Sequence, residues 1–228
     1  MTCTRDREDQ TPGVNVLVTA GPTREPIDPV RYLSNRSSGK MGYAIAHAFA
    51  HEGHRVLLIS GPTSQPIPDH VDYLPVTTAE EMHQAVSRHI ARMDIAIFAA
   101  AVADYTPAHV EPQKIKKTGA RLTLELVRTR DILGSAREPF GFTGTLVGFA
   151  AETENLEQNA RHKLSSKNCD LIVANDVSQP GTGFDSDRNE VILVYPDRSV
   201  ALPADDKVHL ANHLAEAILE LAAGKADR

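Results

Sequence analysis

The chain has 228 residues, with 24 basic and 30 acidic side chains and a formal net charge of −6. That length allows one sizeable α/β domain with a buried core, and the lack of a long basic block argues against nucleic acid as a partner. The two cysteines, Cys3 and Cys169, provide neither a disulfide framework nor a cluster of metal ligands. Because the N-terminus has no apolar signal region and no stretch approaches about 18 apolar residues, we expect a cytoplasmic protein that does not enter a membrane.

Strands and helices alternate along most of the chain. After a polar tail over residues 1–13, which we expect to be disordered, a single domain should span residues 14–228. The hydrophobic pattern of the first half predicts strand 16–19, helix 41–51, strand 55–60, helix 78–92 and strand 94–99. Residues 108–119 have no periodicity and predict a mobile loop, whereas residues 121–127 alternate as in a half-buried strand. The second half predicts strand 145–150, helix 153–166, strand 170–174, strand 190–195 and helix 205–223.

This order of elements predicts a Rossmann-like α/β fold, with a doubly wound, mostly parallel sheet and an added antiparallel hairpin. Ligands of such sheets bind beyond the carboxyl ends of the strands. We therefore expect four segments to gather at one edge of the sheet, namely residues 18–21, 99–104, 149–152 and 174–176.

The sequence Ser37-Ser38-Gly39 stands directly before the helix expected at residue 41. A serine there can cap the helix, and Gly39 and Gly42 allow backbone N–H groups to approach a ligand. The segment could be a helix cap and nothing more, but the nearby Arg31, Arg36 and Lys40 favour a phosphate site. It is not a Walker loop, because Ser34 and Met41 replace the first glycine and the final hydroxyl residue of that motif.

Other candidate positions each have a structural and a functional interpretation. The lysines of residues 114–117 form either a solvated charge run or a lid over a phosphate ligand. Lys163 and Lys167 share one helix face, where lysines commonly interact with the helix dipole. Asp104 could form a surface ion pair or bind ribose or a metal ion. Phe149 and Cys169 are most simply core residues.

Five segments of the chain are the most specific, namely residues 19–42, 99–105, 114–117, 148–153 and 167–178. Together they resemble bacterial phosphopantothenoylcysteine synthetase, and the resemblance extends from about residue 14 to residue 222. It implies a two-step ligase, in which the carboxylate of 4′-phosphopantothenate attacks the α-phosphate of CTP and cysteine then displaces CMP from the acyl-cytidylate. In bacteria this unit often follows a flavin-dependent decarboxylase half. No such half precedes it here, so we expect a stand-alone chain and a separate phosphopantothenoylcysteine decarboxylase in the pathway.

The resemblance also assigns roles to individual residues. Asn35 and Lys114 match catalytic positions of the family. The nucleotide-contacting positions match Asp104, Lys114, Arg130, Asp131, Ile132, Leu133, Phe149, Lys163 and Lys167. The substrate-binding positions match Arg31, Asn35, Ser37, Ser38, Gly39, Ala100 and Ala101. Mg²⁺ would be held mainly by the triphosphate of CTP, with Asp104 as a candidate ligand, because the attack on a triphosphate gathers negative charges that cations must offset.

One position departs from the family pattern, since Arg130 stands where many relatives have proline before Asp-Ile. The choice between CTP and ATP therefore stays open, because the eukaryotic branch of the family uses ATP. The resemblance further implies a homodimer whose active sites draw on both subunits. Two alternative functions are an NAD(P)-type oxidoreductase, which the missing glycine fingerprint disfavours, and a noncatalytic nucleotide-binding regulator.

Overall fold

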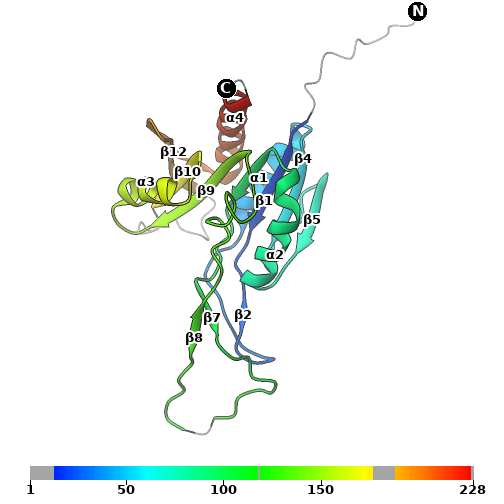
Figure 1. The fold of residues 1–228 in the computed structure, drawn as a ribbon, viewed down its shortest axis with the longest axis vertical. Helices are drawn as coiled ribbons and strands as arrows, with labels where there is room; N and C mark the ends of the chain where they lie inside the picture. Colours follow the sequence, from blue (N-terminus) through cyan, green and yellow to red (C-terminus); the bar gives the residue numbers. More distant parts are fainter. Residues whose placement is uncertain (1–12, 118, 177–187, 227–228) are drawn as a thin grey trace, which may run out of the picture.

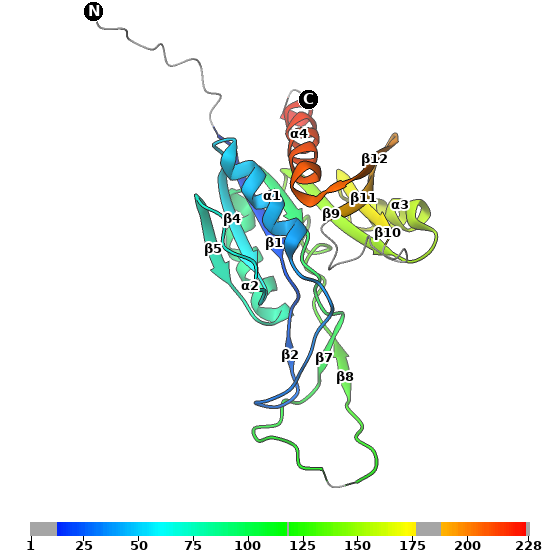
Figure 2. The same ribbon diagram turned by 180° about the vertical axis from the view of Figure 1, so that it is seen from behind.

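The computed structural model describes residues 13–117, 119–176 and 188–226. Residues 1–12 of the expected tail, and residues 177 and 178 at the end of the last family-like segment, lie outside the described residues. The described chain forms an eight-stranded sheet in the order β12-β11-β10-β9-β6-β1-β4-β5. Helices cover both of its faces, as Figures 1 and 2 show from opposite sides, so the predicted doubly wound α/β fold is confirmed.

Six neighbouring strands of the sheet are parallel. In chain order they are β1 (Asn15–Ala20), β4 (Arg55–Ser60), β5 (Val71–Pro75), β6 (Ile95–Phe98), β9 (Thr145–Glu152) and β10 (Leu171–Asp176). Two strands, β11 (Arg188–Val194) and β12 (Ser199–Asp206), continue the sheet in antiparallel register. The sequence predicted neither β5 nor β12, because both lie at sheet edges and lack the continuous apolar run of a buried strand.

The helices are α1 (Lys40–His51), α2 (Ala79–His89), α3 (Leu156–Ser166) and α4 (Lys207–Ala226), and a 3₁₀ turn, η1 (Ile90–Arg92), follows α2. Helices α1 and α4 pack on one face of the sheet, and α2 and α3 pack on the other. Strand β1 shows why two faces are covered. Its fully buried Val16 and Val18 point to the α1 side, whereas the equally buried Leu17 points to the α2 side.

Two short antiparallel ribbons leave the carboxyl edge of the sheet and extend away from the body (Figure 1). One pairs β2 (Glu25–Pro26) with β3 (Tyr32–Leu33), and the other pairs β7 (Tyr105–Pro107) with β8 (Leu126–Arg128). The strand expected over residues 121–127 is thus wrong in extent, and its Leu122, Leu126 and Val127 are exposed. Because the ribbon projects from the sheet, the described residues form no core behind these side chains.

The chain reverses its winding direction between β1 and β6, the switch point at which doubly wound sheets open a crevice. The loops that leave these two strands stay hydrogen-bonded to each other, since the Ala101 amide donates to Gly21 O at 2.9 Å and the Thr23 amide donates to Ala101 O at 3.2 Å. Family-like segments from distant parts of the sequence therefore meet at this edge.

Candidate active site

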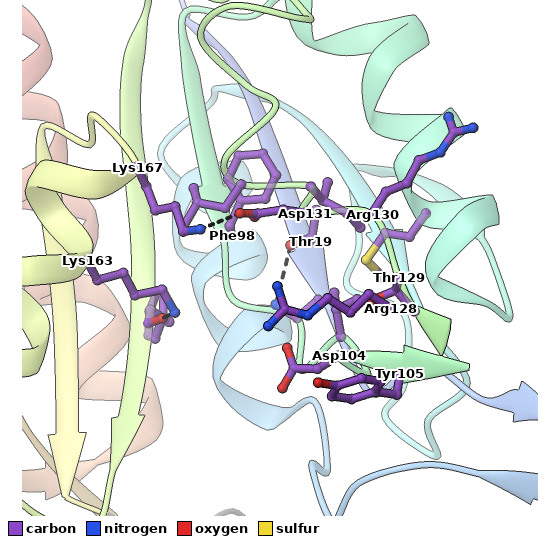
Figure 3. A pocket seen from close by; sticks show the side chains of 16 residues that line it. Thr19, Phe98, Asp104, Tyr105, Arg128, Thr129, Arg130, Asp131, Lys163 and Lys167 are labelled. Atoms are coloured by element: carbon purple, nitrogen blue, oxygen red, sulfur yellow. Dashed lines mark hydrogen bonds and ion pairs between the residues drawn. The ribbon is translucent and has the colours of Figure 1, made fainter. Parts of the chain in front are cut away.

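A cavity of about 540 Å³ opens at the carboxyl ends of β1, β6 and β9, beside the switch point. Figure 3 shows the side chains that surround it. They come from these strands, from the β7–β8 ribbon, from the turn after β8 and from α3. The lining residues are Thr19, Met82, Phe98, Ala100, Val102, Asp104, Tyr105, Arg128, Thr129, Arg130, Asp131, Ile132, Leu133, Phe149, Lys163 and Lys167. Eight of the nine expected nucleotide-binding residues are among them, and Lys114 is the exception.

Lys163 of α3 and Lys167, the residue that follows this helix, point into the cavity (Figure 3). The Lys163 ammonium donates a hydrogen bond to the Phe149 carbonyl at 2.7 Å, so it reaches across to β9. Burial lowers the pKa of Lys163, since desolvation penalises the charged form. An anionic ligand in the cavity would relieve that penalty, which makes Lys163 better suited to ligand binding than to stabilising the free fold.

The second lysine, Lys167, forms an ion pair with Asp131. The turn that carries Asp131 is tightly bonded, because its Oδ1 accepts from the Gly134 amide at 2.8 Å and its main-chain O accepts from the Ser135 amide at 3.0 Å. Burial raises the pKa of the Asp131 carboxyl, but the hydrogen bonds from Lys167 and Gly134 outweigh burial and the net pKa is lowered. The site therefore holds Asp131 as a carboxylate whose charge Lys167 offsets.

Arg130 extends away from the cavity toward α2, where its Nε lies 3.4 Å from Glu80 Oε2 (Figure 3). The Arg130 guanidinium is thereby turned away from the cavity, toward Glu80.

The sequence did not single out Tyr105, Arg128 or Thr129. Tyr105 and Arg128 are paired across the β7–β8 ribbon, and a hydrogen bond with the Tyr105 hydroxyl raises the pKa of Arg128. Thr129 Oγ1 donates to Ala103 O at 2.6 Å and fastens the ribbon to the segment after β6. One signal in the sequence could have identified Arg128, namely its position close to the family-like residues 130–133. Its pairing with Tyr105 could not be predicted, because the sequence did not show which strand pairs with the segment that contains Arg128.

The loop before α1 lies beside the cavity through Ala101. Asn35 Nδ2 donates to Ala101 O at 2.5 Å, and Asn35 Oδ1 accepts from the Ser37 amide at 3.0 Å. Among the expected substrate-binding residues only Ala100 lines the cavity itself. The loop thus forms a neighbouring wall that could hold a second part of a bound molecule.

One expectation for this loop is wrong. Gly39 is the residue that caps α1, with φ of 76° and no side-chain cap, so neither Ser37 nor Ser38 fills that position. This left-handed conformation favours glycine. Gly42 packs closely on β1, because a Cβ at that position would lie 2.6 Å from the Ala20 Cβ, and its part in the approach to a ligand stays a prediction.

Arg31 lies in the connection between β2 and β3, Lys114 lies in the connection between β7 and β8, and neither lines the 540 Å³ cavity. Lys114 lines another cavity of about 510 Å³ with Ile27, Pro107, His109, Glu111, Gln113, Ile115 and residues 122–125. Arg31 binds Asp28, and its Nη2 also donates to Ile115 O at 3.2 Å. The described subunit therefore does not bring the two expected catalytic residues, Asn35 and Lys114, into one cavity.

A magnesium ion complexed with a triphosphate would find a suitable carboxylate in Asp104, which is exposed and lines the cavity. Mg²⁺ usually takes one or two protein carboxylates together with water and phosphate oxygens. Within residues 13–117, 119–176 and 188–226, the one group of three potential metal ligands is Asp205, Asp206 and His209, none of which lines this cavity. The donor set fits an ion carried mainly by its nucleotide.

Comparison with known proteins identifies the family of this chain. Residues 11–221 match the model of the family described as DNA/pantothenate metabolism flavoprotein C-terminal domain. The chain belongs to this family. Over 209 residues it is 49% identical to the coenzyme A biosynthesis bifunctional protein CoaBC of Escherichia coli, and these residues cover 90% of this chain and 52% of that protein. The corresponding protein of Bacillus subtilis is 46% identical over 218 residues, covering 95% of this chain and 53% of the relative.

Solved structures of family members have the same fold. The crystal structure of the C-terminal domain of CoaBC has a TM-score of 0.77 and 39% identity, covering 92% of this chain and 96% of that domain. A structure of the flavoprotein from Streptococcus pneumoniae has a TM-score of 0.79 and 26% identity, covering 91% of this chain and 99% of that one. At 18% identity, a Cab2 mutant in complex with phosphopantothenate-cysteine shares the fold, with a TM-score of 0.75 and coverage of 94% and 88%.

The chain spans about half the length of the bifunctional relatives that it matches. The matching half is the CoaBC C-terminal region, as the structural comparison shows. In the described part of the chain, none of the helices is both long and apolar enough to cross a membrane.

Proposed function

We propose that this chain is a phosphopantothenate–cysteine ligase of coenzyme A biosynthesis that activates 4′-phosphopantothenate with CTP. The observation that carries the proposal is the meeting of Lys163, Lys167, Asp131 and Asp104 in one cavity, on a fold shared with the CoaBC C-terminal domain. The name of the CoaBC relatives supports the pathway, and the phosphopantothenate-cysteine complex of Cab2 supports the product class.

The reaction begins with a carboxylate oxygen of 4′-phosphopantothenate bonding to the α-phosphorus of CTP, as the bond from that phosphorus to the leaving pyrophosphate breaks. Cysteine nitrogen then attacks the acyl carbon, loses a proton and displaces CMP. Lys163, Lys167 and Arg128 are the cavity cations that can offset the charge on the triphosphate and on the leaving pyrophosphate. The main chain of residues 130–133 would bind the base, and the Asn35 amide would orient the acyl-cytidylate from the adjacent loop.

Mg²⁺ supplies charge neutralisation on the triphosphate when it is bound. Asp104 would hold it from the protein side. Asp104 lies close enough to Arg128 to help raise the pKa of that guanidinium.

We propose a homodimer, because the projecting ribbons carry a group of apolar side chains that are largely exposed among the described residues. Val30, Tyr32, Val110, Leu122, Leu126 and Val127 are between 42% and 59% exposed. Pairing two ribbons would bury this surface, and it would let Lys114 reach a nucleotide bound on the other subunit. We also propose that the protein works in the cytoplasm and that its product passes to a phosphopantothenoylcysteine decarboxylase.

Omitting cysteine tests the order of the two steps. Enzyme given 4′-phosphopantothenate, CTP and Mg²⁺ should release pyrophosphate in a burst that matches the number of active sites and then stop, and added cysteine should restart turnover. A burst that strictly requires cysteine would refute the acyl-cytidylate. A protein that binds nucleotide but never releases pyrophosphate or CMP would instead be the noncatalytic regulator.

The nucleotide is tested by comparing kcat/KM for CTP and ATP in the same pyrophosphate assay. CTP should be preferred, because residues 114–117 and the strand ends resemble the bacterial branch. Equal values would contradict the CTP part of the proposal while leaving the ligase activity in place.

A further inference from the structure

Asp28 is a buried carboxylate at the tip of the β2–β3 ribbon, far from the core of the sheet. Its residue is only 3% exposed, although the ribbon around it projects from the body (Figure 2). Burying a carboxylate is unfavourable unless hydrogen bonds satisfy it. Asp28 accepts five of them, three from main-chain amides and two from one guanidinium.

The two oxygens of Asp28 have different partners. Oδ1 accepts from the amides of Val30 and Arg31, both at 2.9 Å, and so holds the turn of its own ribbon. Oδ2 accepts from Arg31 Nε at 3.0 Å, from Arg31 Nη2 at 2.5 Å and from the Ile115 amide at 3.1 Å. Oδ2 thus joins the first ribbon to the segment that carries Lys114.

The contact between Arg31 and Ile115 closes this arrangement, since Arg31 Nη2 also donates to Ile115 O at 3.2 Å. One further main-chain bond, from the Glu111 amide to Ile27 O at 3.0 Å, lies on the same side. The side chains of residues 111–114, 116 and 117 are exposed. Hydrogen bonds therefore anchor this segment at Glu111 and Ile115. The sequence predicts a mobile loop over residues 108–119, and that mobility stays a prediction.

We infer that Asp28 is a positioning residue, which sets the place of Lys114 relative to Arg31 for the ligation reaction. This inference rests on the proposed function, in which Lys114 faces the triphosphate and Arg31 the substrate. Asp28 itself contacts neither the triphosphate nor the substrate. Hydrogen bonds from Arg31 hold the pKa of Asp28 well below its usual range, so the carboxylate accepts at every pH at which the enzyme would work.

The placement of Lys114 matters because electrostatic stabilisation of a leaving pyrophosphate falls steeply with misalignment. A shift of about 1 Å in a reacting or stabilising group can lower a rate by about 10²-fold. Lys114 has an exposed side chain on a segment with few anchors, so loss of the bond at the adjacent Ile115 amide removes the nearest constraint on it.

Asp28→Asn tests this role, because an amide oxygen can keep the two bonds of Oδ1. Its NH₂ group would then face the donors of Arg31 and Ile115, so the link between the ribbons is lost while the turn is kept. Ile115→Pro is the second variant, since it removes the Ile115 amide donor and leaves the pair between Asp28 and Arg31 intact. Asp197→Asn is the matched control, because Asp197 contacts only its neighbour Arg198 among the bonds of the described residues.

Two measurements are required on each variant. Amide hydrogen exchange of residues 111–117 should become faster in Asp28→Asn, with thermal unfolding of the body unchanged and with no change in Asp197→Asn. The pyrophosphate burst of Asp28→Asn should slow by about 10²-fold while KM for CTP changes little, which separates positioning from binding. Adding Lys114→Gln to Asp28→Asn should cost little more than Lys114→Gln alone, because both act through the same ammonium group.

Unchanged exchange at residues 111–117 in Asp28→Asn would overturn the inference, as would losses from Asp28→Asn and Lys114→Gln that simply multiply. A normal burst in Ile115→Pro would also overturn it. If the wild-type protein releases no pyrophosphate, the proposed function fails, and the exchange of residues 111–117 still decides whether Asp28 holds the segment.

Discussion

Replacing Lys163 by methionine should separate ligand binding from fold stability. The Lys163 ammonium lies in the cavity, bonds to Phe149 O at 2.7 Å and has a pKa lowered by burial. Methionine keeps most of the side-chain bulk and removes the charge. The variant should therefore lose the stabilisation of the triphosphate while the fold loses little.

The expected loss of rate is larger than the expected loss of stability. Losing one preorganised charge that faces a developing anion typically costs about 10²- to 10³-fold in rate, or about 2.7–4 kcal/mol. In the free protein, loss of the charge-assisted hydrogen bond is offset by removal of the cost of burying an ammonium. We expect a change in unfolding free energy of about 1 kcal/mol or less, which is about 2–4 °C in Tm for a chain of this size.

The assay is the pyrophosphate burst without cysteine, measured beside thermal unfolding. Lys225→Met is the matched control, because Lys225 also bonds to a carbonyl, Gly144 O at 3.0 Å, and pairs with Asp170 at 2.9 Å. It lies at the opposite, amino ends of β9 and β10 and lines no part of the 540 Å³ cavity. Lys225→Met should keep its burst and lose about 1 kcal/mol of stability at most. A normal burst in Lys163→Met, or an equal loss in Lys225→Met, would refute the reasoning.

Three further predictions concern proton uptake, thiol reactivity and assembly. Bound CTP should raise the lowered pKa of Lys163, so CTP binding takes up a proton at a pH between the pKa of the free protein and that of the complex, and the affinity for CTP falls as pH rises. Calorimetry in buffers of different ionisation enthalpy measures this proton uptake. Proton uptake that persists in Lys163→Met would contradict the assignment. Burial raises the pKa of Cys169 to about 12, so alkylation of its peptide should require unfolding, and rapid labelling of the native protein would show the prediction to be wrong. Val127→Glu should yield monomers in light scattering after gel filtration, whereas Val200→Glu, at a similarly exposed position on β12, should not; an unchanged assembly in Val127→Glu would exclude ribbon pairing through this side chain.

The sequence predicted those parts of the fold where local pattern and burial agree. Residues 16–19 and 55–60 lie in β1 and β4, where the apolar runs 16–18 and 56–59 suit strands that are covered on both faces. The helix ends were less certain: α1 is capped by Gly39 instead of a serine, and α4 begins only at Lys207, where Asp206 accepts from the amides of Val208 and His209. Cap geometry depends on a backbone conformation that residue preference does not fix.

The site, like the fold, could be predicted from the sequence only in part. Residue types and spacing by themselves placed the family-like segments at the carboxyl ends of parallel strands, because topology brings such ends to one edge. Only the tertiary structure decided which side chains face one cavity. It paired Lys167 with Asp131 and Lys163 with the Phe149 carbonyl, added Arg128 and Tyr105 to the cavity, and turned Arg130 toward Glu80. It also placed Lys114 on a ribbon outside the cavity, since ribbon pairing and ion-pair partners depend on contacts between residues far apart in sequence.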